Sequence, residues 1–263
     1  MTRTFADQDR LQELATAHRA TYARGAPFPH VVLDDFLPEE TADRLLREFP
    51  APETFVSESS LAEPRRYGKR RSSREETFSP FTREVLHAFC DDAFLDFLSA
   101  LTGTKDLISD HDRAGALRHF GRGGRLGVHA DANFNAAIDA YRRVNLILYL
   151  NRDWQDAWRG QLELWDADLE RCVTRIAPRF NRAILFGVGD RYFHGFPEAL
   201  RCPRGTTRKS IQFYYYTRTP PDPIVQPHGT LFQWREGDRW RPERLWHAVY
   251  RRLRGRSRRR RRH

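Results

Sequence analysis

The sequence has few cysteines, no long apolar run and little excess charge over most of its length, and each shortage excludes a class of protein. The three cysteines, Cys90, Cys172 and Cys202, are widely spaced and odd in number, which argues against a disulfide framework or a zinc knuckle and favours a reducing compartment. No apolar run reaches the roughly 18 residues of a transmembrane helix, and the N-terminal MTRTFADQDRLQEL lacks the apolar core of a secretory signal. We therefore expect a cytoplasmic protein without a membrane partner.

The positive charge of the chain is concentrated at its C-terminal end. The formal net charge is +10, and residues 251–263, RRLRGRSRRRRRH, contain nine Arg and no acid. Subtracting these nine charges from ten leaves about +1 for residues 1–250. We expect this tail to be disordered, because like charges repel one another. A polyanion or nucleic-acid partner is expected only through the tail, and a solvated tail without a partner is the alternative.

The apolar residues suffice for one large domain in which helices come first and strands follow. Hydrophobic residues make up 40% of the 263 positions and include 18 Phe. Apolar periodicity predicts helices at 7–24, 37–49 and 79–103, and HVVL predicts a strand at 30–33. We interpret the polar segment 51–79 as a surface loop, with a lid over a substrate site as the alternative. This segment and the loop 132–142 are expected to shape a substrate pocket.

Short strands at close spacing predict a β-sandwich or barrel in the second part of the chain. The expected strands lie at 116–120, from there up to 131, and at 143–150, 161–165, 171–176, 183–188 and 209–217. We expect a single domain over 1–250, with a helical part at about 1–113, a β core at about 114–218 and an extension at 219–250. The extension is expected to be helical near 241–254.

The stretch GRGGRLGVHAD, which ends at residue 131, contains a candidate metal site. If it is a strand, His129 and Asp131 point to the same face. His194, in RYFHGF, is the candidate third ligand, and two His with one carboxylate form the facial triad of non-haem iron(II) oxygenases. A His-x-Asp triplet arises by chance about once in every one or two proteins of this size. Neighbouring motifs must therefore support the assignment.

Five motifs in order supply that support. They are GGRLGVHAD, VNLILYLNRDW, RGQLELW, APRFNRAILFGVGDRYFHGF and RKSIQFYYYT, and FPHVVLDDFLPEE precedes them at residues 28–40. Together they resemble the iron(II)- and 2-oxoglutarate-dependent dioxygenases, in particular the prolyl-hydroxylase-like branch. The resemblance implies a mainly β protein with flanking helices (α+β), whose core is a double-stranded β-helix, a distorted jelly roll.

The resemblance also implies a chemistry. His129, Asp131 and His194 would bind Fe(II), and 2-oxoglutarate and dioxygen would take the remaining positions. Members of the family hydroxylate a C–H bond and release succinate and carbon dioxide. The substrate here would be an amino acid, a peptidyl residue or a natural-product intermediate. Because halogenating relatives lack the carboxylate, Asp131 favours hydroxylation.

Three further residues are predicted to bind 2-oxoglutarate. Arg208 leads the strand KSIQFYYYT as the family's carboxylate-binding Arg does, and Arg204, closer in sequence to His194, is the alternative. Tyr149 matches a position whose hydroxyl commonly binds the same carboxylate, and a core aromatic is the alternative. His119 stands ten residues before the metal-binding His129, where relatives often have a Tyr near the cofactor. It would donate the same hydrogen bond, or that contact would be lost.

Two other hypotheses remain open at this point. A barrel that binds metal without catalysis would keep the two His but would have no reason to keep Arg208 and Tyr149. A nucleic-acid-binding protein would use the Arg-rich tail, although the near-neutral body speaks against it. The sequence makes no prediction of the oligomeric state.

Overall fold

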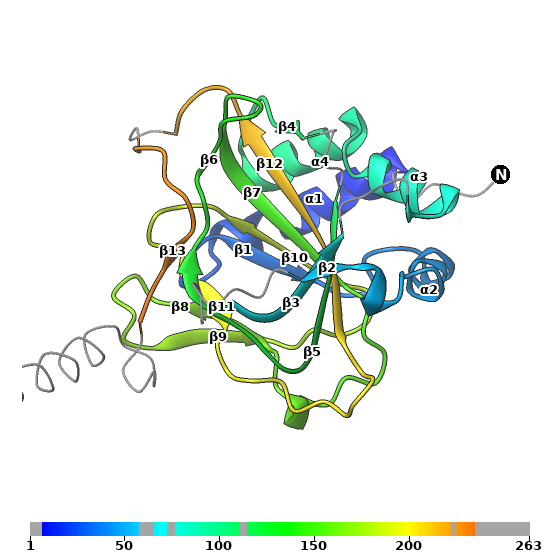
Figure 1. Ribbon diagram of the computed structural model, residues 1–263. Coiled ribbons are helices and arrows are strands. Elements are labelled where there is room, and N and C mark those ends of the chain that lie inside the picture. Colours follow the sequence, from blue (N-terminus) through cyan, green and yellow to red (C-terminus); the bar gives the residue numbers. More distant parts are fainter. Residues whose placement is uncertain (1–6, 58–65, 73–76, 111–114, 222–224, 235–263) are drawn as a thin grey trace, which may run out of the picture. The chain divides into compact units, whose positions relative to one another are not determined.

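A curled antiparallel sheet carries the functional part of the chain (Figure 1). The computed structural model describes residues 7–57, 66–72, 77–110, 115–221 and 225–234. The chain divides after Phe232 into two compact units, and all the helices and strands given below belong to the first. Among the described residues, no helix is long and apolar enough to span a membrane. The helix expected near 241–254 and the tail 251–263 lie outside the described residues, and the extent of the domain to residue 250 stays a prediction.

In the described residues 13 strands form one sheet, with the order β1-β10-β7-β12-β5-β11-β8-β9 along its main path. The strands are β1 (His30–Leu33), β2 (Val56–Ser57), β3 (Arg66–Ser72), β4 (Ile108–Ser109), β5 (Ala116–Ala130), β6 (Phe134–Asn135), β7 (Ala140–Tyr149), β8 (Leu162–Trp165), β9 (Cys172–Ile176), β10 (Arg182–Gly187), β11 (His194–Phe196), β12 (Arg208–Thr217) and β13 (Leu231–Phe232). All neighbouring pairs are antiparallel. The predicted fold class, mainly β with flanking helices, is confirmed.

Each helix begins where the sequence offers a start signal. The helices are α1 (Gln8–Ala23), α2 (Glu39–Arg47), α3 (Pro80–Ala88) and α4 (Asp92–Thr102). The Asp7 carboxylate accepts hydrogen bonds from two backbone N–H groups of α1, and the Ser79 hydroxyl accepts one in α3. At the end of α4, Gly103 takes a left-handed conformation with φ +77°.

The single helix predicted at 79–103 is wrong, because α3 and α4 are two separate helices. The first ends at Ala88, with Phe89 as its C-cap, and Asp91 is extended, with φ −74° and ψ 155°. Asp91 is the N-cap of α4, a position that favours Asp. Apolar periodicity continues across the break because both helices pack on the same core.

The surface loop predicted at 51–79 is also wrong in part. Residues 66–72 form β3, which pairs with residues between 117 and 126 of β5 and with β2. Pairing satisfies the backbone groups of a polar segment that shows no apolar alternation, so the sequence signal was absent. Residues 58–65 and 73–76 lie outside the description. The pairing brings Lys69 opposite Phe120.

The central strands β7 and β12 separate the helix-covered core from an inner cavity. On β7, Val144, Leu146 and Leu148 belong to the core that α1 to α4 cover. The alternate positions, Asn145 and Ile147 among them, line the cavity. A strand with both faces buried reads as a continuous apolar run, which explains the sequence VNLILYL.

A buried amide joins the start of α2 to the sheet. Asn181 accepts a hydrogen bond from the Leu37 N–H at 2.9 Å and donates one to the Leu37 carbonyl at 2.7 Å. Its φ of +54° lies in the left-handed region, which Asn tolerates better than most residues. The turn before β10 therefore depends on this side chain.

We expect Asn181→Ala to lower the free energy of unfolding by about 2–4 kcal/mol, because it leaves two buried backbone groups of Leu37 without partners. Urea-induced unfolding followed by circular dichroism measures the change. Asn181→Gly removes the same hydrogen bonds without the left-handed strain and should be less destabilising than Ala. Wild-type stability in both variants would contradict this role.

Candidate active site

Three side chains that could bind a metal meet where β5 and β11 pair. His129 and His194 are direct cross-strand partners, and Asp131 follows the end of β5. Asp131 Oδ1 lies 3.4 Å from His129 Nε2, and its Oδ2 lies 3.4 Å from His194 Nε2. One ligand atom from each residue lies within 4.8 Å of the others. The structure thus brings together the three residues that the motif predicted.

Backbone hydrogen bonds orient both imidazoles. Nδ1 of His129 lies 2.8 Å from the Gly127 carbonyl, and Nδ1 of His194 lies 3.1 Å from the Tyr192 carbonyl. A carbonyl accepts only, so each Nδ1 carries the proton and each Nε2 presents a lone pair toward Asp131. This is the tautomer that a metal requires.

The pKa shifts of His129 and Asp131 favour the protonation states that bind a cation. Burial and the neighbouring His194 lower the pKa of His129, against the effect of Asp131. Burial alone would raise the pKa of Asp131, but the two imidazoles and Arg142 hold it well below its ordinary value. Asp131 also accepts a hydrogen bond from Asn145 Nδ2 at 2.5 Å. A neutral imidazole and an ionised carboxylate are the forms that ligate metals.

The close approach of β5 and β11 requires a glycine. A Cβ on Gly195 would lie 2.7 Å from the Gly127 carbonyl oxygen and 2.9 Å from that of Leu126. The register between the two strands slips by one residue here, since His194 pairs with His129 while Phe196 pairs with Leu126. This bulge sets the direction of the His129 side chain.

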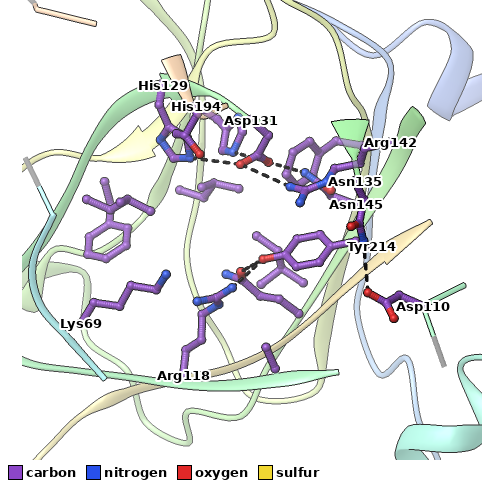
Figure 2. A pocket seen from close by; sticks show the side chains of 18 of the residues that line it. Lys69, Asp110, Arg118, His129, Asp131, Asn135, Arg142, Asn145, His194 and Tyr214 are labelled. Atoms are coloured by element: carbon purple, nitrogen blue, oxygen red, sulfur yellow. Dashed lines mark hydrogen bonds and ion pairs between the residues drawn. The ribbon is translucent and has the colours of Figure 1, made fainter. Parts of the chain in front are cut away.

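The triad faces a cavity of about 370 Å³ inside the barrel (Figure 2). Figure 2 shows His129, Asp131 and His194 on one side of the cavity, with Lys69 and Arg118 on the opposite side. Tyr214 projects into the space between them. The volume is that of a small-molecule site.

Arg208 is a buried cation in the wall of this cavity. It is 2% exposed, its Nε donates to the Gly160 carbonyl at 2.8 Å, and its Nη2 donates to the Tyr149 hydroxyl at 2.8 Å. Burial lowers the pKa of Arg208, and Tyr149 opposes the shift. The alternative, Arg204, is exposed and does not line the cavity. The position of Arg208 suits a ligand carboxylate, and that role stays a prediction.

The prediction that His119 contacts the cofactor is contradicted, because its ring lies on the other face of β5. Its Nδ1 lies 2.8 Å from Thr207 Oγ1 and its Nε2 lies 2.9 Å from the Pro50 carbonyl, and neither partner lines the cavity. Counting ten residues back from His129 assumes a regular strand, whereas bulges in β5 change which residues face inward. Arg118 and Phe120 line the cavity in its place.

Sequence reasoning missed several polar residues of the cavity wall. Lys69, Arg118 and Arg142 line the cavity. None was predicted individually, although Lys69 and Arg142 lie in the segments 51–79 and 132–142 that were expected to shape the pocket. Arg118 interrupts the apolar run ALRHF, which is a signal for a buried charge. Lys69 gave no such signal, because it reaches the site only through the pairing of β3 with β5.

Comparison with known proteins agrees with this geometry. The profile of the 2OG-Fe(II) oxygenase superfamily matches residues 114–216, the strands that carry the triad and Arg208. Residues 114–216 are thus similar in sequence to the 2OG-Fe(II) oxygenase superfamily. The mouse prolyl 3-hydroxylase OGFOD1 is 33% identical over 110 residues, which cover 35% of this chain and 20% of that protein. The match therefore spans a fifth of the length of this relative.

Several solved structures share the fold of this chain. A Trichoplax adhaerens prolyl hydroxylase, solved with a peptide, has a TM-score of 0.58 at 19% identity, covering 79% of this chain and 91% of its own. A Pseudomonas putida prolyl-4-hydroxylase has a TM-score of 0.55 at 20% identity, covering 76% and 98%. HygX from Streptomyces hygroscopicus, solved with nickel, 2-oxoglutarate and hygromycin B, has a TM-score of 0.51 at 13% identity, covering 80% and 94%. These likenesses confirm the predicted double-stranded β-helix.

The residues present fit the cofactors of the superfamily. Two imidazole nitrogens and one carboxylate on one side of a common point are the donor set of an iron(II) site with open positions. In the same cavity, a buried guanidinium and a phenol hydroxyl would supply donors for the distal carboxylate of 2-oxoglutarate. Iron(II) and 2-oxoglutarate are therefore the cofactors that this site suits.

We expect Asp131→Ala to weaken the binding of manganese(II), used as an air-stable replacement for iron(II), on the order of 100-fold. The variant removes the anionic ligand and leaves two neutral imidazoles. Equilibrium dialysis under nitrogen measures the dissociation constant. The matched control is Asp110→Ala, since Asp110 lines the same cavity outside the triad. Equal losses in both variants would contradict a specific metal site.

Proposed function

We propose that the protein is an iron(II)- and 2-oxoglutarate-dependent dioxygenase that hydroxylates a C–H bond of an amino acid, a peptidyl residue or a natural-product intermediate. Succinate and carbon dioxide are the co-products. The observation that carries the proposal is the convergence of His129, Asp131 and His194 on one cavity that also holds the buried Arg208. A metal-binding barrel without catalysis would need the first three residues but not the fourth.

Each residue of the chain has a defined task in this proposal. The two imidazoles and the carboxylate of Asp131 hold iron(II) through the atoms that the backbone bonds to His129 and His194 leave available. Asn145 fixes the second carboxylate oxygen of Asp131, so that the carboxylate cannot rotate away. Bound iron supplies the activation of dioxygen that hydroxylation of a C–H bond requires.

The second task, the orientation of 2-oxoglutarate, belongs to Arg208 and Tyr149. The guanidinium keeps its position through the Gly160 carbonyl, and Gly160 has no side chain to obstruct it, since a Cβ there would lie 3.1 Å from Arg208 Cδ. A bidentate contact to a carboxylate matches the planar group. The barrel wall excludes bulk water and strengthens this charge pair.

The relatives support an oxygenase and leave the substrate open. OGFOD1 is named a prolyl 3-hydroxylase, two solved relatives are prolyl hydroxylases, and HygX was solved with hygromycin B. A polyanion-binding role would act through residues 251–263, which lie outside the described residues, and it stays a second hypothesis. A cytoplasmic location also stays a prediction.

We expect wild-type protein to form succinate from 2-oxoglutarate in the presence of iron(II) and air, even without substrate, as members of this family do slowly. His129→Ala should abolish this turnover, and Arg208→Ala should raise the KM for 2-oxoglutarate on the order of 100-fold, because a buried charge pair is lost. Succinate is quantified by chromatography and mass spectrometry.

Arg204→Ala is the matched control, because it removes an exposed Arg near Arg208 in the sequence. It should leave the rate of succinate formation and the KM for 2-oxoglutarate unchanged. Loss of turnover in Arg204→Ala but not in Arg208→Ala would move the cofactor carboxylate to Arg204. Metal binding without any iron-dependent succinate would favour the non-catalytic barrel.

A further inference from the structure

Arg118 is a buried positive charge that no carboxylate of the described chain neutralises. Its side chain is on β5, with the residue 5% exposed, and it lines the cavity. Nη2 donates a hydrogen bond to the Tyr214 hydroxyl at 2.5 Å, while Nε and Nη1 have no hydrogen-bond partner. Burial of an unpaired charge opposes folding, so such a group is retained where a ligand supplies the counter-charge.

The Tyr214 hydroxyl holds this guanidinium in place without cancelling its charge. The Tyr214 hydroxyl donates to Gln212 Oε1 at 2.9 Å, which directs its oxygen lone pair toward Arg118. The guanidinium of Arg142 lies 4.1 Å from the centre of the Tyr214 ring and fixes the ring from the other side. Arg118 is thus preorganised for a ligand that the protein itself does not provide.

Lys69 adds a second positive charge on the same side of the cavity. It is 8% exposed, and Figure 2 shows it and Arg118 pointing into the cavity from the side opposite the triad. The two other cations of the described wall have tasks, since Arg142 lies 3.7 Å from Asp131 and Arg208 contacts Tyr149. The charge of Arg118 therefore remains after the metal ligands and the cofactor cation are assigned.

We propose that Arg118, assisted by Lys69, binds an oxyanion of the substrate, either a carboxylate or a phosphate group. The inference rests on the proposed function, because it places the substrate across the cavity from the metal. A guanidinium binds both kinds of oxyanion through paired N–H donors. Of the substrates considered above, it selects a small molecule with a free acidic group over an uncharged peptidyl residue, whose carboxyl is part of an amide.

The test uses the full-length protein loaded with zinc(II) and 2-oxoglutarate under nitrogen, so that the cofactor occupies Arg208. The probes are acetate and methyl phosphate, titrated at constant ionic strength and followed by calorimetry. We expect at least one probe to bind wild type and to bind Arg118→Gln about tenfold more weakly or worse. Stronger binding of acetate would identify a carboxylic acid, and stronger binding of methyl phosphate would identify a phosphate ester.

Arg204→Gln is the matched control, and Arg118→Lys, which keeps the charge, should retain part of the binding and serves if Arg118→Gln does not fold. Absence of binding by either probe, or equal binding by wild type and Arg118→Gln, would overturn the inference. So would loss of 2-oxoglutarate binding in Arg118→Gln, since Arg118 would then belong to the cofactor. Absence of succinate in the wild-type assay above would refute the proposed function alone, because probe binding requires no turnover.

Discussion

The site depends on one cross-strand pair, His129 on β5 opposite His194 on β11. The two imidazoles are 65 positions apart in the sequence, and only the sheet register brings their Nε2 atoms to the same carboxylate. Gly195 permits the close approach of the strands, and backbone carbonyls fix both rings. A shift of this register by one residue would turn His194 to the other face and disperse the triad.

The sheet also allows one set of strands to build both a stable core and a polar cavity. On β12, Ile211, Phe213 and Tyr215 pack beneath the helices, while Arg208 and Tyr214 face inward. The apolar face stabilises the strand through burial, which is the dominant favourable term in folding. This stabilisation offsets the free-energy cost of burying charged side chains on the inner face.

The side chains that line the cavity carry more positive than negative charge. Lys69, Arg118, Arg142 and Arg208 line the cavity with the carboxylates of Asp110 and Asp131. Because residues 1–250 as a whole are near neutral, this charge is a local property of the cavity. This positive charge attracts anionic ligands, and the low dielectric constant of the cavity wall strengthens the attraction. The effect applies equally to an anionic cofactor and to an anionic substrate.

The sequence by itself determined the strands of the core and the order of the family motifs, and it named His129, Asp131, His194, Arg208 and Tyr149 as candidates, because alternation and short motifs are local patterns. The tertiary structure decided which of these side chains meet and which neighbours face inward. His119 was predicted in the cavity, yet bulges in β5 expose Arg118 there instead. Residues 66–72 form a strand because they pair with β5, and this interaction between distant segments leaves no periodic pattern in the sequence of residues 66–72.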